Sequence, residues 1–236
     1  MSNKLALVFG GSRGIGAACV KALADGGFDV AYTYVSNPPS QSNARERAYR
    51  ADITKPELVA QVFADVQRDF GRAPDCVVAN AGINVPPGPM AQFKPEDFRK
   101  LVEVNLVGAF NILAEAARRV ADGGSIIALT TSLVRHAAPG LGPYSATKAA
   151  VECLVRSMAK ELAARNVRVN AVAPGPVDTD LFRAGKTEEA KQRSAALSPF
   201  NRVGEPHEVA QVVAFLASDQ ASWVHGQIVQ PNGGLI

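Results

Sequence analysis

Short apolar runs alternate along the chain with longer segments whose apolar residues recur every three or four positions. The first run, at 4–9, reads KLALVF and ends in glycines, which is typical of a strand buried on both faces of a parallel sheet. The next segment, at 15–25, carries apolar residues at helical spacing until Gly26 and Gly27 interrupt it. The chain is therefore predicted to begin with a strand followed by a helix.

The same alternation continues to the end of the chain. Further strands are predicted at 28–35, 48–53, 75–79, 125–129, 167–172 and 227–230, and further helices at 58–70, 98–120, 144–164 and 206–218. Strands that alternate with helices over the whole length predict an α/β fold, with a doubly wound parallel sheet and helices on both of its faces. Because no linker, repeat or low-complexity segment divides the 236 residues, we predict a single domain over 1–236.

Composition and charge argue against several classes of protein. Hydrophobic residues make up 47% of the chain, enough for a large core, but no apolar stretch reaches the roughly 18 residues of a membrane helix. The formal net charge is only +3, and we interpret the charged stretch at 44–50 as a solvated helix face. We therefore predict neither a nucleic-acid partner nor a membrane partner.

Cysteine usage favours a reducing compartment. Cys19, Cys76 and Cys153 are widely spaced and stand among apolar residues, so we predict buried free thiols rather than disulfides. No group of histidines, cysteines and acids has the spacing of a metal site, and we predict none. The N-terminus lacks the pattern of a signal peptide, which together with the free thiols predicts a cytoplasmic location.

A glycine-rich segment, GGSRGIG at 10–16, joins the first predicted strand to the first predicted helix. Glycine lets the backbone turn tightly and approach a pyrophosphate, and the helix N-terminus offers free N–H groups and the positive end of its dipole. Because the segment lies between a strand and a helix, it predicts a dinucleotide site. The residues expected to contact the dinucleotide here are Gly11, Ser12, Arg13, Gly14, Ile15 and Gly16.

The end of the second predicted strand favours NADP over NAD. An acid at this place would bind the ribose 2′-hydroxyl and repel a 2′-phosphate, but no acid stands between Tyr32 and Asn37. Arg13 in the glycine turn supplies a cation that can pair with a phosphate, and Ser36 supplies a hydroxyl. The sequence therefore predicts NADP as the cofactor.

Tyr144 and Lys148 are four positions apart in the predicted helix 144–164, so their side chains share one face. A phenol with a pKa of roughly 10 is a poor proton carrier near neutrality. A nearby ammonium favours the phenolate, so we expect Lys148 to lower the pKa of Tyr144. The pair predicts proton transfer to or from an oxygen atom while hydride moves at the neighbouring carbon.

These motifs together resemble the short-chain dehydrogenase/reductase family. Besides the glycine segment and the Tyr144–Lys148 pair, the chain has Asn80-Ala81-Gly82 after the fourth predicted strand and a proline-glycine segment at 174–179. The resemblance covers essentially the whole chain and implies an NAD(P)-binding Rossmann-type oxidoreductase domain. It adds as cofactor-binding residues Asp52, Ile53, Asn80, Ala81, Gly82, Pro174, Gly175, Val177 and Thr179, together with Tyr144 and Lys148.

The resemblance also implies the roles of the catalytic residues. Tyr144 exchanges a proton with the substrate oxygen, Lys148 bonds the nicotinamide ribose, and Asn105 holds a water that links Lys148 to solvent. A serine usually lies 13 positions before the tyrosine; Thr131 has this spacing, whereas Ser132 lies 12 positions before it. We favour Ser132 by residue type and keep Thr131 as the alternative. His136 lacks an obvious acid partner, so we interpret it as a loop or pocket residue.

The segments 170–179 and 202–206 are similar to those of bacterial-type 3-oxoacyl-[acyl-carrier protein] reductases. This similarity implies NADPH-dependent reduction of a ketone to a secondary alcohol, with a small carbonyl or alcohol compound as substrate. The alternatives are an NADP-dependent alcohol dehydrogenase and a non-catalytic NADP-binding protein. Relatives are usually homotetramers, so we expect helices 98–120 and 144–164 to pack in one interface.

Two connecting segments carry expectations of their own, a lid and a shortened crossover. Residues 181–200 are rich in Ala, Lys, Glu and Gln and are predicted to form a mobile helical lid over the substrate. Only 16 positions separate Ser36 from Asp52, where relatives place a longer helix. A short crossover at 41–47 is therefore expected.

Overall fold

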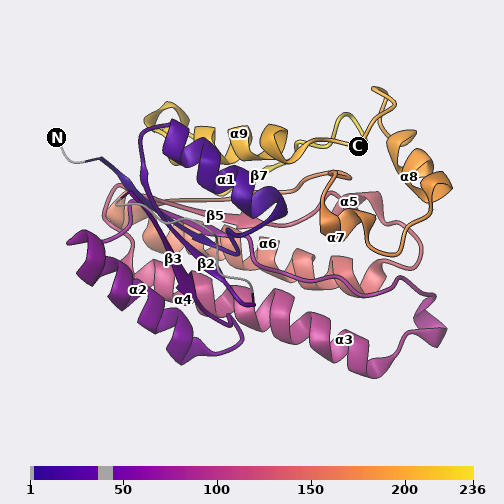
Figure 1. Cartoon of the computed structure of the whole chain (residues 1–236), viewed down its shortest axis with the longest axis horizontal. Coiled ribbons are helices and arrows are strands. Elements are labelled where there is room, and N and C mark those ends of the chain that lie inside the picture. Colours follow the sequence, from indigo (N-terminus) through magenta and orange to yellow (C-terminus); the bar gives the residue numbers. More distant parts are fainter. Residues whose placement is uncertain (1–2, 37–44) are drawn as a thin grey trace.

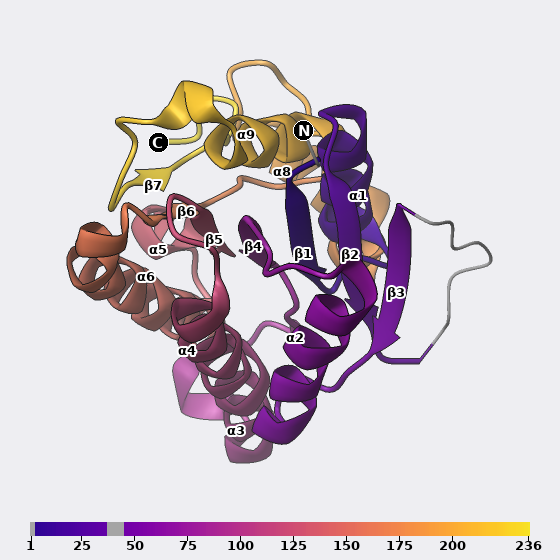
Figure 2. The ribbon, with the colours of Figure 1, turned by 90° about the vertical axis from the view of Figure 1, so that its left-hand side faces the viewer.

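The computed structural model describes residues 3–36 and 45–236. In these residues, drawn in Figure 1, one sheet of seven parallel strands has the order β3-β2-β1-β4-β5-β6-β7, and Figure 2 labels each of these strands. The strands are β1 (Leu5–Phe9), β2 (Asp29–Tyr34), β3 (Glu46–Arg50), β4 (Cys76–Ala79), β5 (Ser125–Leu129), β6 (Arg168–Val172) and β7 (Ile228–Val229). The order reverses between β1 and β4, which is where dinucleotides bind in doubly wound sheets. The predicted fold class is confirmed.

Helices cover both faces of the sheet (Figure 2). On one face lie α1 (Gly14–Asp25) and α9 (Pro206–Ala217), and on the other lie α2 (Pro56–Phe70), α4 (Ala109–Arg119) and α6 (Gly142–Leu162). Successive side chains of a strand point to opposite faces. In β1, Leu5, Leu7 and Phe9 therefore pack against the α2, α4 and α6 layer, whereas Ala6 and Val8 pack against α1 and α9. Because both faces are buried, β1 is apolar at every position.

The shorter helices lie mainly near the ends of strands or in connections. They are η1 (Met90–Gln92), α3 (Pro95–Leu101), α5 (Leu133–His136), η3 (Ala163–Arg165), α7 (Asp180–Arg183), α8 (Glu188–Ala195) and η4 (Asp219–Ala221). The predicted lid at 181–200 contains most of α7 and all of α8, so its helical character is confirmed. Figure 1 places both helices at the end of the molecule where α5 lies.

The predicted helix 98–120 is not one regular helix. It consists of the end of α3, a π-helical segment η2 (Val102–Gly108) and α4. A π-helical turn shifts the side chains that follow it relative to an α-helix, and such turns are frequent at functional sites. Apolar spacing does not reveal one inserted residue, because the pattern on each side remains helical.

The interpretation of 44–50 as a helix face is wrong. Glu46–Arg50 forms β3, the outermost strand, and residue 44 lies outside the described residues. Charged side chains suit an edge strand, because they discourage pairing with another chain. The strand also ends at Arg50, not at the predicted residue 53. The expected crossover at 41–47 falls partly outside the described residues, and Glu46 and Arg47 belong to β3.

The thiols only partly follow the prediction. Cys19 and Cys76 are buried, but Cys153 is exposed on α6, so the prediction was wrong for this residue. A helix surrounded by apolar residues in sequence still turns one side to solvent. Within the described residues, no helix is long and apolar enough to cross a membrane, and no three His, Cys or acidic side chains are grouped to hold a metal ion.

Candidate active site

The glycine turn is held by close backbone packing between β1 and α1. A Cβ atom on Gly16 would lie 2.0 Å from the carbonyl oxygen of Gly10 and 2.5 Å from Nδ2 of Asn80. That same Nδ2 donates a hydrogen bond of 2.8 Å to the Gly10 carbonyl. Gly10 and Gly14 have φ of 76° and 53°, which side chains other than glycine rarely adopt. The sequence thus needs glycine at these places to bring α1 close to the strand ends.

The N-terminus of α1 is open toward a ligand. Arg13 occupies the N-cap without a side-chain cap, and the first turn contains no acid. The first N–H groups of a helix have no partner within it and carry the positive end of the dipole. Gly11 is buried whereas Ser12 and Arg13 are exposed, and Ile15 packs partly against the α1 and α9 layer. This end of the helix therefore fits the pyrophosphate of a dinucleotide.

The adenosine side of the site lies at the ends of β2 and β3. Ser36 is exposed directly after β2. After β3, Oδ1 of Asp52 accepts hydrogen bonds from the N–H (3.0 Å) and the hydroxyl (2.8 Å) of Thr54. Ile53 is buried and its carbonyl accepts a bond of 2.9 Å from Nδ2 of Asn111. These bonds fix the segment in which an adenine contact is expected.

Asn105 is a buried clamp within the π-helical segment. Its Oδ1 accepts the Ile83 N–H at 2.8 Å and its Nδ2 donates to the Ile83 carbonyl at 2.9 Å. A Cβ on Gly82 would lie 3.1 Å from Asn105 Oδ1 and 3.4 Å from Nζ of Lys148. The segment Asn80-Ala81-Gly82 therefore meets both Asn105 and Lys148, although they come from different helices.

Lys148 and Tyr144 lie on α6 at the end of the central strands. Lys148 is 6% exposed and its Nζ donates a hydrogen bond of 3.0 Å to the carbonyl of Leu129, the last residue of β5. Burial lowers the pKa of Lys148 to about 8 and raises the pKa of Tyr144 to about 12. The expected lowering of the Tyr144 pKa is therefore wrong for the chain alone, because burial deprives the phenolate of hydration. The phenol stays protonated.

Ser132 and Thr131 both lie just beyond β5. The Ser132 hydroxyl donates to the Ala173 carbonyl at 2.8 Å, and its N–H donates to the Pro174 carbonyl at 2.9 Å. Oγ1 of Thr131 accepts the Leu133 N–H at 3.3 Å. Ser132 is thus attached to the proline-glycine segment, whereas Thr131 stabilises the start of α5.

The proline-glycine segment closes the site from the side of β6. A Cβ on Gly175 would lie 3.0 Å from the backbone of Asn232, so the segment packs tightly against the C-terminal region here. Val177 is buried, and Thr179 caps α7 by accepting the Phe182 N–H at 3.1 Å. A Cβ on Gly14 would lie 3.4 Å from the methyl group of Thr179. The segment that follows β6 therefore lies against the glycine turn that follows β1.

The comparisons with known proteins agree with this geometry. A family model described as enoyl-(acyl carrier protein) reductase matches residues 10–236 of the chain. The chain belongs to the short-chain dehydrogenase/reductase family.

Relatives within the family carry several names. The chain is 38% identical to an NADPH-dependent aldehyde reductase-like chloroplastic protein of Arabidopsis thaliana, over 100% of this chain and 95% of the relative. It is 34% identical to a 3-oxoacyl-[acyl-carrier-protein] reductase of Staphylococcus epidermidis, over 99% of each chain. A blue fluorescent protein from a metagenomic library, solved in complex with NADPH, superposes with a TM-score of 0.88 at 33% identity and covers 98% of this chain and 97% of its own.

Two loops near the family's tyrosine position were missed by sequence reasoning. The N–H of Gly88 donates to the carbonyl of Gly140 at 3.1 Å, and a Cβ on Gly142 would lie 3.4 Å from Cε of Met90. Met90 is 72% exposed. Because residues 137–143 lead directly into Tyr144, these two contacts bring the segment around Gly88 and Met90 close to the start of α6. Their prolines and glycines were visible in the sequence, but their pairing depends on the fold.

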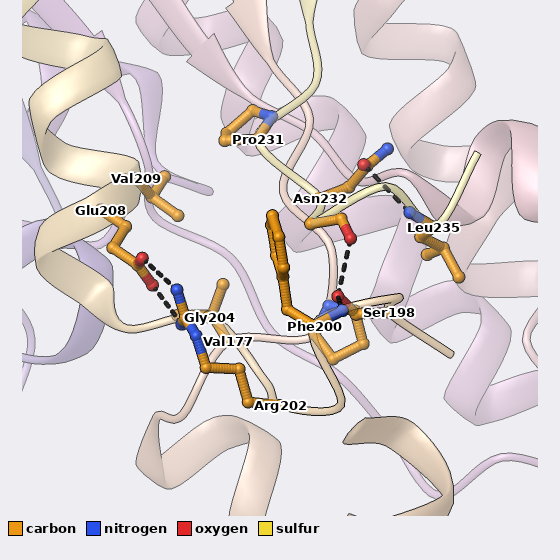
Figure 3. A pocket seen from close by; sticks show the side chains of 12 residues that line it. Val177, Ser198, Phe200, Arg202, Gly204, Glu208, Val209, Pro231, Asn232 and Leu235 are labelled. Atoms are coloured by element: carbon orange, nitrogen blue, oxygen red, sulfur yellow. Dashed lines mark hydrogen bonds and ion pairs between the residues drawn. The ribbon is translucent and has the colours of Figure 1, made fainter. Parts of the chain in front are cut away.

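A cavity of about 190 Å³ is lined in part by the proline-glycine segment (Figure 3). Pro176 and Val177 form part of its wall, together with residues at the end of the lid and at the C-terminus. Arg202 and Glu208 form an ion pair of 2.6 Å at its edge, which Figure 3 shows. Sequence reasoning missed this cavity because three distant segments build it. The remaining lining residues are Ser198, Phe200, Gly204, Val209, Pro231, Asn232, Gly233 and Leu235.

Replacement of the two candidate hydroxyls should separate their roles. We expect Ser132→Ala to lower kcat by about 10²- to 10³-fold, the typical loss when one donor to a developing oxyanion is removed. Thr131→Val should lower kcat less than about threefold, because its Oγ1 faces the Leu133 N–H. Steady-state kinetics of both variants measures this. Collapse of turnover in Thr131→Val alone would assign the role to Thr131.

Proposed function

We propose that this protein reduces a carbonyl compound to an alcohol with NADPH, and that Tyr144 donates the proton to the carbonyl oxygen. The observation that carries the proposal is the geometry of the site: Tyr144 lies one turn before Lys148 on α6, and Lys148 reaches the end of β5, where the glycine turn after β1 also lies. Burial raises the pKa of Tyr144 to about 12, so the phenol is protonated at neutral pH. A protonated phenol is the form that reduction requires, because hydride addition leaves negative charge on the oxygen. The NADPH-dependent relatives support this direction.

The residues of the site have complementary parts in the proposed reaction. The nicotinamide supplies the hydride when it is bound. Ser132 polarises the carbonyl with its hydroxyl, after exchanging its bond to Ala173 for one to the substrate. Lys148 holds the ribose from its buried position, and Asn105 positions Gly82 and Ile83 beside that lysine. The open N-terminus of α1 holds the pyrophosphate.

A 3-oxoacyl thioester is the proposed substrate. The 3-oxoacyl-[acyl-carrier-protein] reductase relative supports it, and the exposed Met90 side chain near the start of α6 suits contact with an alkyl chain. The test follows NADPH oxidation at 340 nm with a short 3-oxoacyl thioester, beside NADH, an aldehyde and a 2-enoyl thioester. Turnover with the 3-oxoacyl thioester and NADPH is expected. Turnover with only the enoyl thioester would overturn carbonyl reduction, and tight NADPH binding without turnover of any of these compounds would favour the binding-only alternative.

Arg13 should contribute to cofactor choice. It is exposed at the N-cap of α1, and we expect Arg13→Ala to weaken NADPH binding by about 10-fold or more while changing NADH binding less than twofold. The reason is that only NADPH carries the 2′-phosphate with which a guanidinium pairs. Fluorescence titration of both cofactors measures the effect. Equal weakening of the two would contradict a phosphate contact.

The proposed assembly is a homotetramer in the cytoplasm. Phe98 on α3 and Phe110 on α4 are 43% and 52% exposed, as an interface on this side would require. Light scattering should then give the mass of four chains of 24.8 kDa. Burial of these two aromatic rings between chains would stabilise the assembly, which supports the proposal.

A further inference from the structure

Arg50 is the last residue of β3 and lies beside the end of β2. In the parallel register it is paired with Tyr34, the last residue of β2. Its Nε donates a hydrogen bond of 3.1 Å to the carbonyl of Val35. Ser36 follows immediately and is exposed. The guanidinium is therefore anchored at the strand end where the ribose of a dinucleotide is expected.

The side chains of β3 point alternately to the two faces of the sheet, and this determines the face on which Arg50 lies. Ala48 packs with α1 and α9, whereas Tyr49 packs with the α2, α4 and α6 layer. Because side chains alternate along a strand, Arg50 points to the same face as Ala48. Tyr32 lies on this face as well, and a Cβ on Gly11 would meet it at 2.6 Å. Arg50 thus shares its face of the sheet with the glycine turn.

The other arginines near Arg50 are used in ion pairs. Arg45 pairs with Asp29 at 3.0 Å, and Arg47 pairs with Asp69 at 3.6 Å while it stacks on Phe70. Among the described residues, no carboxylate pairs with Arg50. Its single bond to a carbonyl uses Nε and leaves the two terminal amino groups, each with two N–H donors, for a ligand.

We propose that Arg50 binds the 2′-phosphate of NADP from the side of β3 and, together with Arg13 from the side of α1, selects this cofactor against NAD. The strand order β3-β2-β1 places Ser36, after β2, between the two arginines. The fork of a guanidinium held by Nε matches two phosphate oxygens. This inference rests on the proposed use of NADPH and adds a second residue to its selection, whichever carbonyl compound is the substrate.

The test measures binding of fragments of the cofactor by titration calorimetry. In Arg50→Gln, 2′,5′-ADP should bind about 10- to 50-fold more weakly, whereas 5′-AMP should change less than twofold. Arg47→Gln is the matched control, because Arg47 lies on the same strand but points to the opposite face. This control should change neither affinity more than twofold. Raising the salt concentration should reduce the preference of the unmodified protein for 2′,5′-ADP.

Two outcomes would overturn the proposal. Equal weakening of both fragments would mean that Arg50 only braces the backbone at Val35, and unchanged binding of both would mean that it has no part in the site. Arg50→Lys covers the case in which the glutamine variant does not fold. Lysine retains the charge but not the fork, so it should weaken 2′,5′-ADP by about 3- to 10-fold, again without an effect on 5′-AMP. Neither fragment contains a nicotinamide, so failure of this inference leaves the proposed reduction untouched.

Discussion

Tyr144→Phe is expected to lower kcat for NADPH oxidation by about 10²- to 10⁴-fold, the usual contribution of a general acid. The phenol lies on α6 one turn before Lys148, and its pKa of about 12 leaves it protonated at neutral pH. Phenylalanine keeps the ring and removes the proton. NADPH binding should change less than about twofold, since the ring still fills its place.

Steady-state kinetics and NADPH titration of the same preparation measure both quantities. Tyr49→Phe is the matched control, because it removes the hydroxyl of another tyrosine, one that lies on β3 and donates a hydrogen bond of 3.0 Å to Asp69. It should cost about 1 kcal/mol of stability and leave kcat unchanged. If Tyr144→Phe kept more than about a tenth of the turnover, another group would supply the proton.

The fold follows from local pattern where burial is uniform. β1 is apolar at all five positions because helices cover both faces, and such a run is recognised without knowledge of its neighbours. β3 is the opposite case. Its sequence ERAYR contains three charged residues, and only its place at the edge of the sheet makes this composition suitable for a strand. An edge is a property of topology, so the sequence pattern around 44–50 predicts the wrong element.

The site shows the same limit. Gly10, Gly14 and Gly16 can be predicted from the sequence because a tight turn before a helix requires glycine at fixed spacing. The contact of Gly14 with Thr179 cannot, since 165 positions separate the two residues and only the folded sheet brings the ends of β1 and β6 to the same side. The clamp of Asn105 on Ile83 depends likewise on where the π-helical segment turns that side chain.

The pKa of Tyr144 shows why pairwise spacing is insufficient for electrostatics. Four positions on a helix place Lys148 near Tyr144, and this alone predicts a lowered pKa. In the structure both groups lose hydration, and Lys148 directs Nζ to the Leu129 carbonyl. Burial therefore raises the pKa of Tyr144 and lowers the pKa of Lys148, and both shifts favour the neutral form of the side chain. The amount of burial depends on β5 and on the loops around Tyr144, none of which the motif contains.

The glycine turn carries the second large effect that we expect. Gly16→Ala should destabilise the protein by about 3 kcal/mol or more and weaken NADPH binding by about 100-fold or more. The added Cβ would stand 2.0 Å from the carbonyl oxygen of Gly10, a backbone atom that cannot turn aside, and 2.5 Å from the Asn80 Nδ2 that is bonded to it, so α1 has to move outward. The free N–H groups at the start of α1 then no longer point at the pyrophosphate.

Gly26→Ala is the matched control at the other end of α1. Gly26 has φ of −76°, and a Cβ there would lie 3.3 Å from the Ala22 carbonyl, a contact that a shift of a few tenths of an ångström relieves. The thermal midpoint and the NADPH affinity of Gly26→Ala should stay close to those of the unmodified protein. Thermal unfolding and cofactor titration of both variants measure the difference. If Gly16→Ala bound NADPH normally, the close packing of α1 on β1 would not be what positions the cofactor, and the helix N-terminus would lose its proposed role.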